Sequence, residues 1–442
     1  MVTAQRREER LKDVPIAITA VSGQQLSKAG ITSVTDLGLV TPGLNFAVQG
    51  AFAEPTIRGI GTSVTGAGAD ANVSLYLDGV YQPSQTANLF DLNNVQSVEV
   101  LKGPQGTLFG RNATGGAITI TTLDPSFHPS ADVSAGYGSF NEVRLNGYAT
   151  GPISQDIAGD LAVQYKRDDG YIYNVNTGHE DANADTISLR SKLLFKPTDK
   201  LSFVLGGNYS NIQDSSPFSV KPVHNDNPFA ETVNFPSNPY DIDLTDDPTI
   251  RTVSDGINLH AKYASDIGTF TSITSYERIV AYLNADIDNS PIFTSGAHIP
   301  SQEETVTQEL NYASPQMGPF SWVGGVYFYW DNTGEHVTIT SGAVPAPHIA
   351  ADIIGRVRTD AEAAFAEGNY DFTDRLRLIA GVRYSTEEKR AGVDLSGVPG
   401  TNWSDRHRWF SVTPRGSLRY SLDPYSNVYL TISQGFKSGN YN

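Results

Sequence analysis

Cysteine is absent from the 442 residues, methionine occurs only twice, and basic residues are outnumbered by acidic ones, 31 to 48. Without cysteine the chain has no disulfide framework, no thiolate metal site and no cysteine nucleophile. The formal net charge of −17 excludes a nucleic-acid binder, because neutralising phosphates requires a surplus of Lys and Arg.

Long hydrophobic runs are also missing. No stretch of about 18 consecutive apolar residues occurs, which excludes a membrane-spanning helix. A spanning β-barrel stays open as an interpretation, because its strands turn only alternate side chains toward lipid. The 41 glycines, 21 tyrosines and 19 phenylalanines favour β structure.

Motifs for catalysis and metal binding are lacking as well. The eight histidines lie singly, no HExxH occurs, and there is no Gly-x-Ser-x-Gly elbow. Residues Gly110–Ala117 have the glycine spacing of a phosphate-binding loop, but Gly116 stands where the lysine is required. We therefore predict that the protein is not an enzyme and has neither a cofactor nor a metal site.

The first part of the chain, residues 1–125, is predicted to be a mixed α/β domain. Ser22 and Ser33 are candidate N-caps of two short helices. The pair Asp78-Gly79 predicts a tight type I′ hairpin turn, because both residue types tolerate positive φ. Strands are predicted at Pro55–Ile60, Val73–Leu77, Val95–Lys102 and Ala117–Thr121.

The second part, residues 126–442, is repetitive, with strands of about 9 to 15 residues in which apolar and polar side chains alternate. Short and long connections follow one another in turn. An up-and-down membrane barrel, with small turns on one side and large loops on the other, produces this asymmetry. A soluble β-sandwich is the alternative, but it has no reason to place every long connection at one end. The long connections are Asp168–Asn183, Gln213–Thr252, Asn284–Ser301, Glu335–Val357 and Ala391–His407.

The segment from Val98 to Ile118 is the most distinctive of the chain. It combines a strand ending in Lys102-Gly103-Pro104, a Leu-Phe-Gly turn and a Gly-Gly-x-Ile run, and it resembles the plug-domain signature of TonB-dependent outer-membrane receptors. Residues Thr56–Gly59 and Leu75–Val80 match further plug motifs, and Ala380–Tyr384 and Gly435–Gly439 resemble barrel segments. The signature residues are Glu99, Gly103, Pro104, Gly110, Gly115 and Gly116.

The resemblance implies an α+β plug domain followed by an antiparallel transmembrane β-barrel, which has about 22 strands in this family. About 13 strands can be counted between Ala131 and Lys437. Because an open sheet leaves unpaired backbone groups in lipid, we expect further strands beyond this chain, which is not expected to transport on its own. Met1–Ala4 resembles only the trailing end of the TonB box that precedes a plug in the family.

The resemblance also implies site residues. Arg58 and Lys102 occupy motif positions whose cations form ion pairs with barrel glutamates and hold the plug in place, and the alternative is that they are solvated. The plug loops that face outward are expected at about residues 46–52, 61–71 and 81–87. The candidate ligand contacts in these loops are Gln49, Phe52, Ser63, Asp70, Tyr81, Gln82 and Gln85.

The function that the resemblance implies is active uptake of a scarce solute, foremost a ferric siderophore, across the bacterial outer membrane. The implied partners are the TonB energy-transducing protein of the inner membrane, lipopolysaccharide and outer-membrane lipid, and a small ligand, with the receptor as a monomer. Uptake of an oligosaccharide is an alternative, for which Tyr171, Tyr173 and Tyr240 are stacking candidates. A surface-binding protein without transport is another. The acidic connection Gln213–Thr252 is interpreted as a solvated surface, with divalent-cation binding as its alternative.

Overall fold

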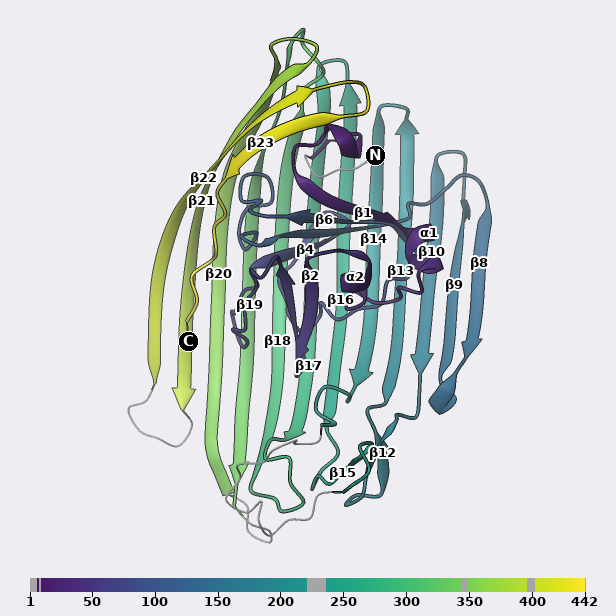
Figure 1. Cartoon of the computed structure of the whole chain (residues 1–442), viewed down its shortest axis with the longest axis vertical. Helices are drawn as coiled ribbons and strands as arrows, with labels where there is room; N and C mark the ends of the chain where they lie inside the picture. Colours follow the sequence, from purple (N-terminus) through teal and green to yellow (C-terminus); the bar gives the residue numbers. More distant parts are fainter. Residues whose placement is uncertain (1–5, 8, 221–235, 343–347, 396–401, 442) are drawn as a thin grey trace.

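The computed structural model describes residues 6–7, 9–220, 236–342, 348–395 and 402–441. A curved antiparallel sheet of thirteen strands, with β8 and β23 at its two edges, curves around a smaller α/β domain, the plug (Figure 1). Neighbours in the sheet are consecutive large strands of the chain, so every connection is a simple up-and-down one. The strands are β8 (Ser130–Tyr137), β9 (Val143–Pro152), β10 (Ile157–Arg167), β13 (Ala184–Thr198), β14 (Leu201–Asp214), β16 (Thr249–Ser265), β17 (Gly268–Asp286), β18 (Ser295–Ala313), β19 (Phe320–Ser341), β20 (His348–Asp371), β21 (Leu376–Leu395), β22 (Trp403–Ser421) and β23 (Asn427–Ser433).

The plug is built on a five-stranded sheet with the order β1-β6-β7-β4-β5. All neighbours are antiparallel except β4 and β7. A separate hairpin, β2–β3, two short helices and a 3-10 turn at Leu11–Asp13 complete the domain. A second 3-10 turn, Ser139–Asn141, lies between β8 and β9 of the large sheet. The elements are β1 (Ala17–Ser22), α1 (Gly23–Lys28), α2 (Leu37–Val40), β2 (Leu44–Gln49), β3 (Phe52–Ile57), β4 (Val73–Leu77), β5 (Val80–Gln82), β6 (Val95–Lys102) and β7 (Gly116–Thr122).

The core of the plug lies between this sheet, the β2–β3 hairpin and the helices. Leu37 and Ile57 are fully buried there against Val98, Ile118 and Ile120. Fully burying side chains of this size contributes roughly 1.5–3 kcal/mol each, so the plug has a hydrophobic core of its own.

The two ends of the large sheet differ. At one end the strands are joined by short turns, and Lys12 and Arg419 hold the 3-10 turn at residues 11–13 against the barrel there. At the other end lie the long connections, with a small sheet of β11 (Ile172–Asn174), β12 (His179–Asp181) and β15 (Asp241–Ile242). The tip of the β2–β3 hairpin lies toward this second end (Figure 1), where Ala51 packs against Ile250, Leu283 and Ala285.

The structure corrects two local predictions. The connections predicted at 284–301, 335–357 and 391–407 are largely strand, because cross-strand hydrogen bonding continues well beyond the apolar alternation that was counted. The second helix begins after Asp36 rather than Ser33, because the Asp36 carboxylate accepts from the Ser33 backbone N–H at 3.1 Å. No helix in the described part of the chain is long and apolar enough to cross a membrane.

The division of the chain at residues 125 and 126 stays a prediction, although it falls between the end of β7 and the start of β8. The predicted acidic connection 213–252 includes residues 221–235, and the TonB-box-like segment Met1–Ala4 is within residues 1–5. Both of these stretches lie outside the described residues.

Candidate functional site

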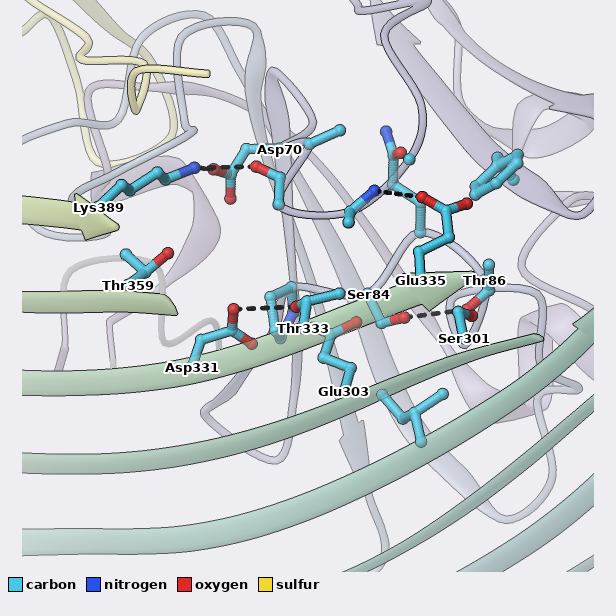
Figure 2. Close-up of a pocket in the computed structure, with 18 of the residues that line it drawn as sticks. Asp70, Ser84, Thr86, Ser301, Glu303, Asp331, Thr333, Glu335, Thr359 and Lys389 are labelled. Carbon is cyan, nitrogen blue, oxygen red and sulfur yellow. Dashed lines mark hydrogen bonds and ion pairs between the residues drawn. The ribbon is translucent and has the colours of Figure 1, made fainter. Parts of the chain in front are cut away.

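A polar pocket lies where the plug loops meet the inner wall of the barrel, toward the end with the long connections (Figure 2). The plug loops 66–70 and 83–86 form one side of the pocket, and strands β18, β19, β20 and β21 form the other. Its cavity volume is about 50 Å³. The space therefore suits one small group of a ligand rather than a whole ligand.

Asp70 is the centre of the polar contacts at one side of the pocket. Its Oδ2 lies 2.7 Å from the Nζ of Lys389 and 2.9 Å from an Nη of Arg111, and its Oδ1 accepts from Asn112 at 2.7 Å. Burial alone would raise the pKa of Asp70, but Arg111 and Lys389 together lower it to about 2. The carboxylate is therefore charged at neutral pH.

Arg111 links this cluster to a second carboxylate. Its Nε lies 3.2 Å from the Oε2 of Glu387 on β21, and its guanidinium lies 4.5 Å from the ring centroid of Tyr329 on β19. Arg111 belongs to the plug, whereas Glu387 and Lys389 belong to the barrel. We call Asp70, Arg111, Glu387 and Lys389 the apical cluster, and it ties the plug to β21 through buried ion pairs.

The loop that carries Asp70 approaches the barrel closely because of a glycine. Gly68 has a φ of +71°, and a Cβ at this position would lie 2.7 Å from a methyl group of Val357. The absence of a side chain lets the Gly68 carbonyl accept from Lys389 Nζ at 2.9 Å. A glycine here thus positions Asp70 against β21.

Three further carboxylates line the pocket from the barrel wall. Asp331 accepts from the hydroxyls of Thr305 and Thr333 at 3.2 and 3.1 Å. Glu335 accepts from the backbone N–H of Ala67 at 2.9 Å, and Glu303 accepts from the hydroxyl of a plug residue, Ser84. Figure 2 shows all three carboxylates directed toward the space between barrel and plug.

A second contact between plug and barrel lies at the opposite side of the plug. Lys192 on β13 lies 3.1 Å from Asp78, in the turn between β4 and β5, and 3.1 Å from Asp124. Asp78 also accepts from the backbone N–H and the hydroxyl of Thr122, both at 2.7 Å. Burial raises the pKa of Asp78, but Lys192 and Thr122 outweigh it and lower the pKa overall. We call Asp78, Asp124 and Lys192 the lateral anchor.

The predicted ligand contacts fall into three groups. Phe52, Asp70 and Gln85 line the pocket. Tyr81 and Gln82 are buried inside the plug region, where the Tyr81 hydroxyl accepts from Asn112 at 3.0 Å. Gln49 and Ser63 are exposed on the surface and do not line the pocket. A role in ligand contact stays a prediction for all seven residues.

The predicted ion pairs of Arg58 and Lys102 with barrel glutamates have no counterpart in the described ranges. Arg58 is exposed, and the Nζ of Lys102 donates to the carbonyl of Pro42, within the plug, at 2.7 Å. Two other plug cations do pair with barrel glutamates. Arg6 lies 3.0 Å from Glu309 on β18, and Arg111, which directly follows the signature residue Gly110, lies 3.2 Å from Glu387 on β21.

The remaining signature residues shape the plug backbone. Gly110 has a φ of +81°, and a Cβ there would lie 2.7 Å from the Arg383 guanidinium. A Cβ on Gly116 would lie 2.2 Å from the Leu101 carbonyl. The carbonyl of Pro104 accepts from Ser433 on β23 at 3.0 Å, Glu99 is buried on β6, and Gly103 and Gly115 flank the turn between β6 and β7. The signature therefore fixes backbone turns and barrel contacts.

Arg111, Glu303, Asp331, Glu335, Glu387 and Lys389 were not among the predicted site residues. The position of Arg111 beside the signature was a usable signal. The others lie in ordinary alternating strands, which carry no local mark of a site. Within the described ranges no group of three or more His, Asp or Glu side chains is arranged to hold a metal ion.

Comparison with known proteins identifies both parts of the chain. The family described as TonB-dependent Receptor Plug Domain matches residues 10–117, and the family described as TonB dependent receptor-like, beta-barrel matches residues 216–442. The pesticin receptor of Yersinia enterocolitica is 28% identical over 456 residues, which cover 100% of this chain and 64% of that receptor. The vitamin B12 transporter BtuB of Vibrio vulnificus is 24% identical over 388 residues, covering 84% of this chain and 58% of the transporter.

The fold has solved counterparts. The crystal structure of the ferric yersiniabactin uptake receptor FyuA from Yersinia pestis aligns with a TM-score of 0.81 and 26% identity, covering 97% of this chain and 66% of that one. This chain thus spans 64% of the length of the pesticin receptor that it matches. Because the barrel family alone matches more than half of the 442 residues, the chain belongs to the TonB-dependent receptors, a family of outer-membrane receptors and transporters rather than of enzymes.

Proposed function

We propose that the protein takes up a ferric siderophore across the outer membrane, using energy delivered by the TonB protein of the inner membrane. The observation that carries this proposal is the pocket between the plug loops and the barrel wall, at the end of the barrel with the long connections. Lipopolysaccharide and lipid surround the barrel in this proposal, and the receptor acts as a monomer.

One of the similar solved structures supports iron chelates as the substrate class. The matching structure with a TM-score of 0.81 is named as an uptake receptor for ferric yersiniabactin. The pesticin receptor matches the whole length of this chain. An outer membrane has no ATP of its own, so a receptor there needs a mechanical connection to an energised protein, and TonB is that connection in the proposal.

The apical cluster gives the proposal a physical route. Asp70 lies in a plug loop that lines the pocket, and its partner Lys389 lies on the barrel. A ligand that binds in the pocket alters the surroundings of these ion pairs and thereby the attachment of the plug. Binding of a ligand in the pocket is thus coupled to the strength of the ion pairs that hold the plug to β21.

Uptake of an organic nutrient is the second candidate. The vitamin B12 transporter among the relatives favours it, as do three exposed tyrosines near the long connections, Tyr171, Tyr173 and Tyr240. Aromatic side chains of this kind stack on flat or sugar-like ligands.

Growth of a deletion strain separates the two candidates. We expect the strain that lacks the gene to grow poorly under iron limitation and to lose uptake of radioactive iron supplied as a siderophore complex, with normal growth on limiting vitamin B12 or glycans. A strain carrying the gene with tonB deleted should show the same loss. Unchanged iron uptake in the deletion strain would refute the siderophore proposal.

A further inference from the structure

We propose that the pocket receives a positively charged group of the ligand, such as an ammonium, so that the preferred chelate is cationic at one end rather than anionic. This inference rests on the proposed function, because it specifies the ligand of the same pocket. The juxtaposition behind it is that of Glu303, Asp331 and Glu335 on two neighbouring strands, where none of the three forms an ion pair within the described ranges.

Negatively charged side chains outnumber positively charged ones in the lining of the pocket. Four carboxylates, those of Asp70, Glu303, Asp331 and Glu335, face two cations, those of Arg111 and Lys389. Both cations already form ion pairs with Asp70, and Arg111 also forms one with Glu387. The apical cluster is therefore close to neutral by itself and leaves the other three carboxylates unbalanced.

The contacts of those three carboxylates are all with uncharged donors. The partners are hydroxyl groups for Glu303 and Asp331 and a backbone N–H for Glu335. Over the part of the chain that the structure describes, no ion pair involves any of the three. Asp331 is only 4% exposed, so water reaches it poorly.

Carboxylates in this situation attract a cation strongly. Burying a carboxylate without a positive partner is unfavourable, and a charged hydrogen bond to an ammonium is about twice as strong as a neutral one. An anionic group in the same space would meet three carboxylates at short range and be repelled. Charge complementarity of this kind determines specificity between otherwise similar ligands.

The size and the polar lining of the pocket fit a compact donor. A cavity of about 50 Å³ accommodates an ammonium group. Its further lining includes the hydroxyls of Thr86, Ser301 and Thr359, which can accept from an ammonium, beside apolar side chains such as Phe52 and Ile279. The body of the chelate would then remain in the open lumen while its charged arm enters the pocket.

The test uses one iron chelator in three forms that differ only in their terminal group. The probes are a linear ferric trihydroxamate with a free terminal amine, its N-acetyl derivative and its N-succinyl derivative, which are cationic, neutral and anionic at that end. Binding to the receptor in outer membranes is measured by competition against the radioactive iron complex. We expect the amine form to bind at least about tenfold more tightly than the acetyl form, and the succinyl form to bind least.

Variants connect this preference to the pocket. Glu303→Gln and Asp331→Asn should each reduce the preference for the amine form to less than about threefold. Glu304→Gln is the matched control, because Glu304 is the next residue on β18 and does not line the pocket, and it should leave the preference unchanged. Heat-modifiable mobility on gels shows that each variant is folded, and Glu335→Gln provides a third variant if one is not.

Equal affinities for the three probes, tighter binding of the succinyl form, or no binding of the amine form would overturn the inference. So would a preference that survives both Glu303→Gln and Asp331→Asn in folded receptors. The proposed function fails separately, when deletion of the gene leaves siderophore-iron uptake unchanged. A receptor that imports an anionic chelate would keep the proposed function and refute this inference alone.

Discussion

The Nζ of Lys389, on barrel strand β21, lies 2.7 Å from the Oδ2 of Asp70, in a plug loop 319 residues earlier in the chain. Lys389 is 1% exposed and Asp70 is 4% exposed. Replacing both partners of a buried ion pair together changes folding stability little. Removing only one partner is strongly destabilising, because it leaves the other charge buried and unbalanced. The apical cluster is therefore a contact whose disruption affects the plug loop strongly.

Replacing Lys389 tests this contact. In Lys389→Met we expect the plug loop 61–71 to lose roughly 2–4 kcal/mol of local stability, because Asp70 keeps only Arg111 as its cation. Hydrogen exchange of the loop amides measures the loss. Lys196→Met is the control, because Lys196 is half-exposed and pairs only with an exposed aspartate, Asp199. Equal loop protection in the two variants would contradict the prediction.

The pH dependence of this contact has a defined sign. The pKa of Asp70 is about 2 in the folded protein, below its ordinary value of 3.8. A lowered pKa means that the stabilisation is complete above pH 4 and is lost only as the pH falls toward 2. The difference in loop protection between the natural protein and Lys389→Met should therefore stay constant from pH 5 to pH 8.

The lateral anchor offers a comparison between two carboxylates on one lysine. Asp78 and Asp124 both lie 3.1 Å from Lys192, but their side chains are 13% and 67% exposed. We expect Asp78→Asn to destabilise the β4–β5 hairpin by roughly 2–4 kcal/mol, and Asp124→Asn by less than about 1 kcal/mol, because solvent screens the exposed pair. Urea dependence of hairpin hydrogen exchange measures both. Similar costs for the two variants would show that burial does not govern this anchor.

Several local elements of the plug could be predicted from sequence because short-range chemistry determines them. The Asp-Gly turn forms as expected, with φ values of +49° at Asp78 and +80° at Gly79. Ser22 caps the first helix in a capping box with Gln25. Strands β4 and β6 have the predicted bounds. For the turn and the cap, the residues that decide the structure are neighbours in the chain.

The site could be predicted only in part. Phe52, Asp70 and Gln85 line the pocket, and they were candidates because the outward loops follow from the plug resemblance, while their contact with a ligand stays a prediction. The partners of Asp70 were not predicted, since Lys389 meets it only through the stagger of β21 against the plug. An alternating strand shows which residues face the lumen, but not at which height each one meets the plug.

The final prediction concerns the small sheet of β11, β12 and β15 among the long connections. Asp181 on β12 is 3% exposed, and burial together with the nearby Asp247 raises its pKa to about 7. The Nδ1–H of His179 donates to the Asp247 carboxylate at 2.6 Å, and this hydrogen bond raises the pKa of His179. Because their pKa values are raised, Asp181 and His179 are both more protonated in the folded sheet than in the unfolded chain.

A raised pKa gives stability that is complete below the unfolded value and is lost as the pH rises through the folded value. The small sheet should therefore weaken between pH 4 and pH 7 and exchange its amides faster at pH 8 than at pH 5.5, by about tenfold after correction for intrinsic rates. The lowered pKa of Asp247 acts in the opposite direction, but only at acidic pH near its ordinary value of 3.8.

Asp181→Asn should remove most of this pH dependence and strengthen the sheet at pH 8, whereas Asp246→Asn, at an exposed neighbouring position, should leave the pH dependence unchanged. Slower exchange at pH 8 than at pH 5.5 in the natural protein would refute the assignment, because the carboxyl group of Asp181 would then be stabilised in its charged form.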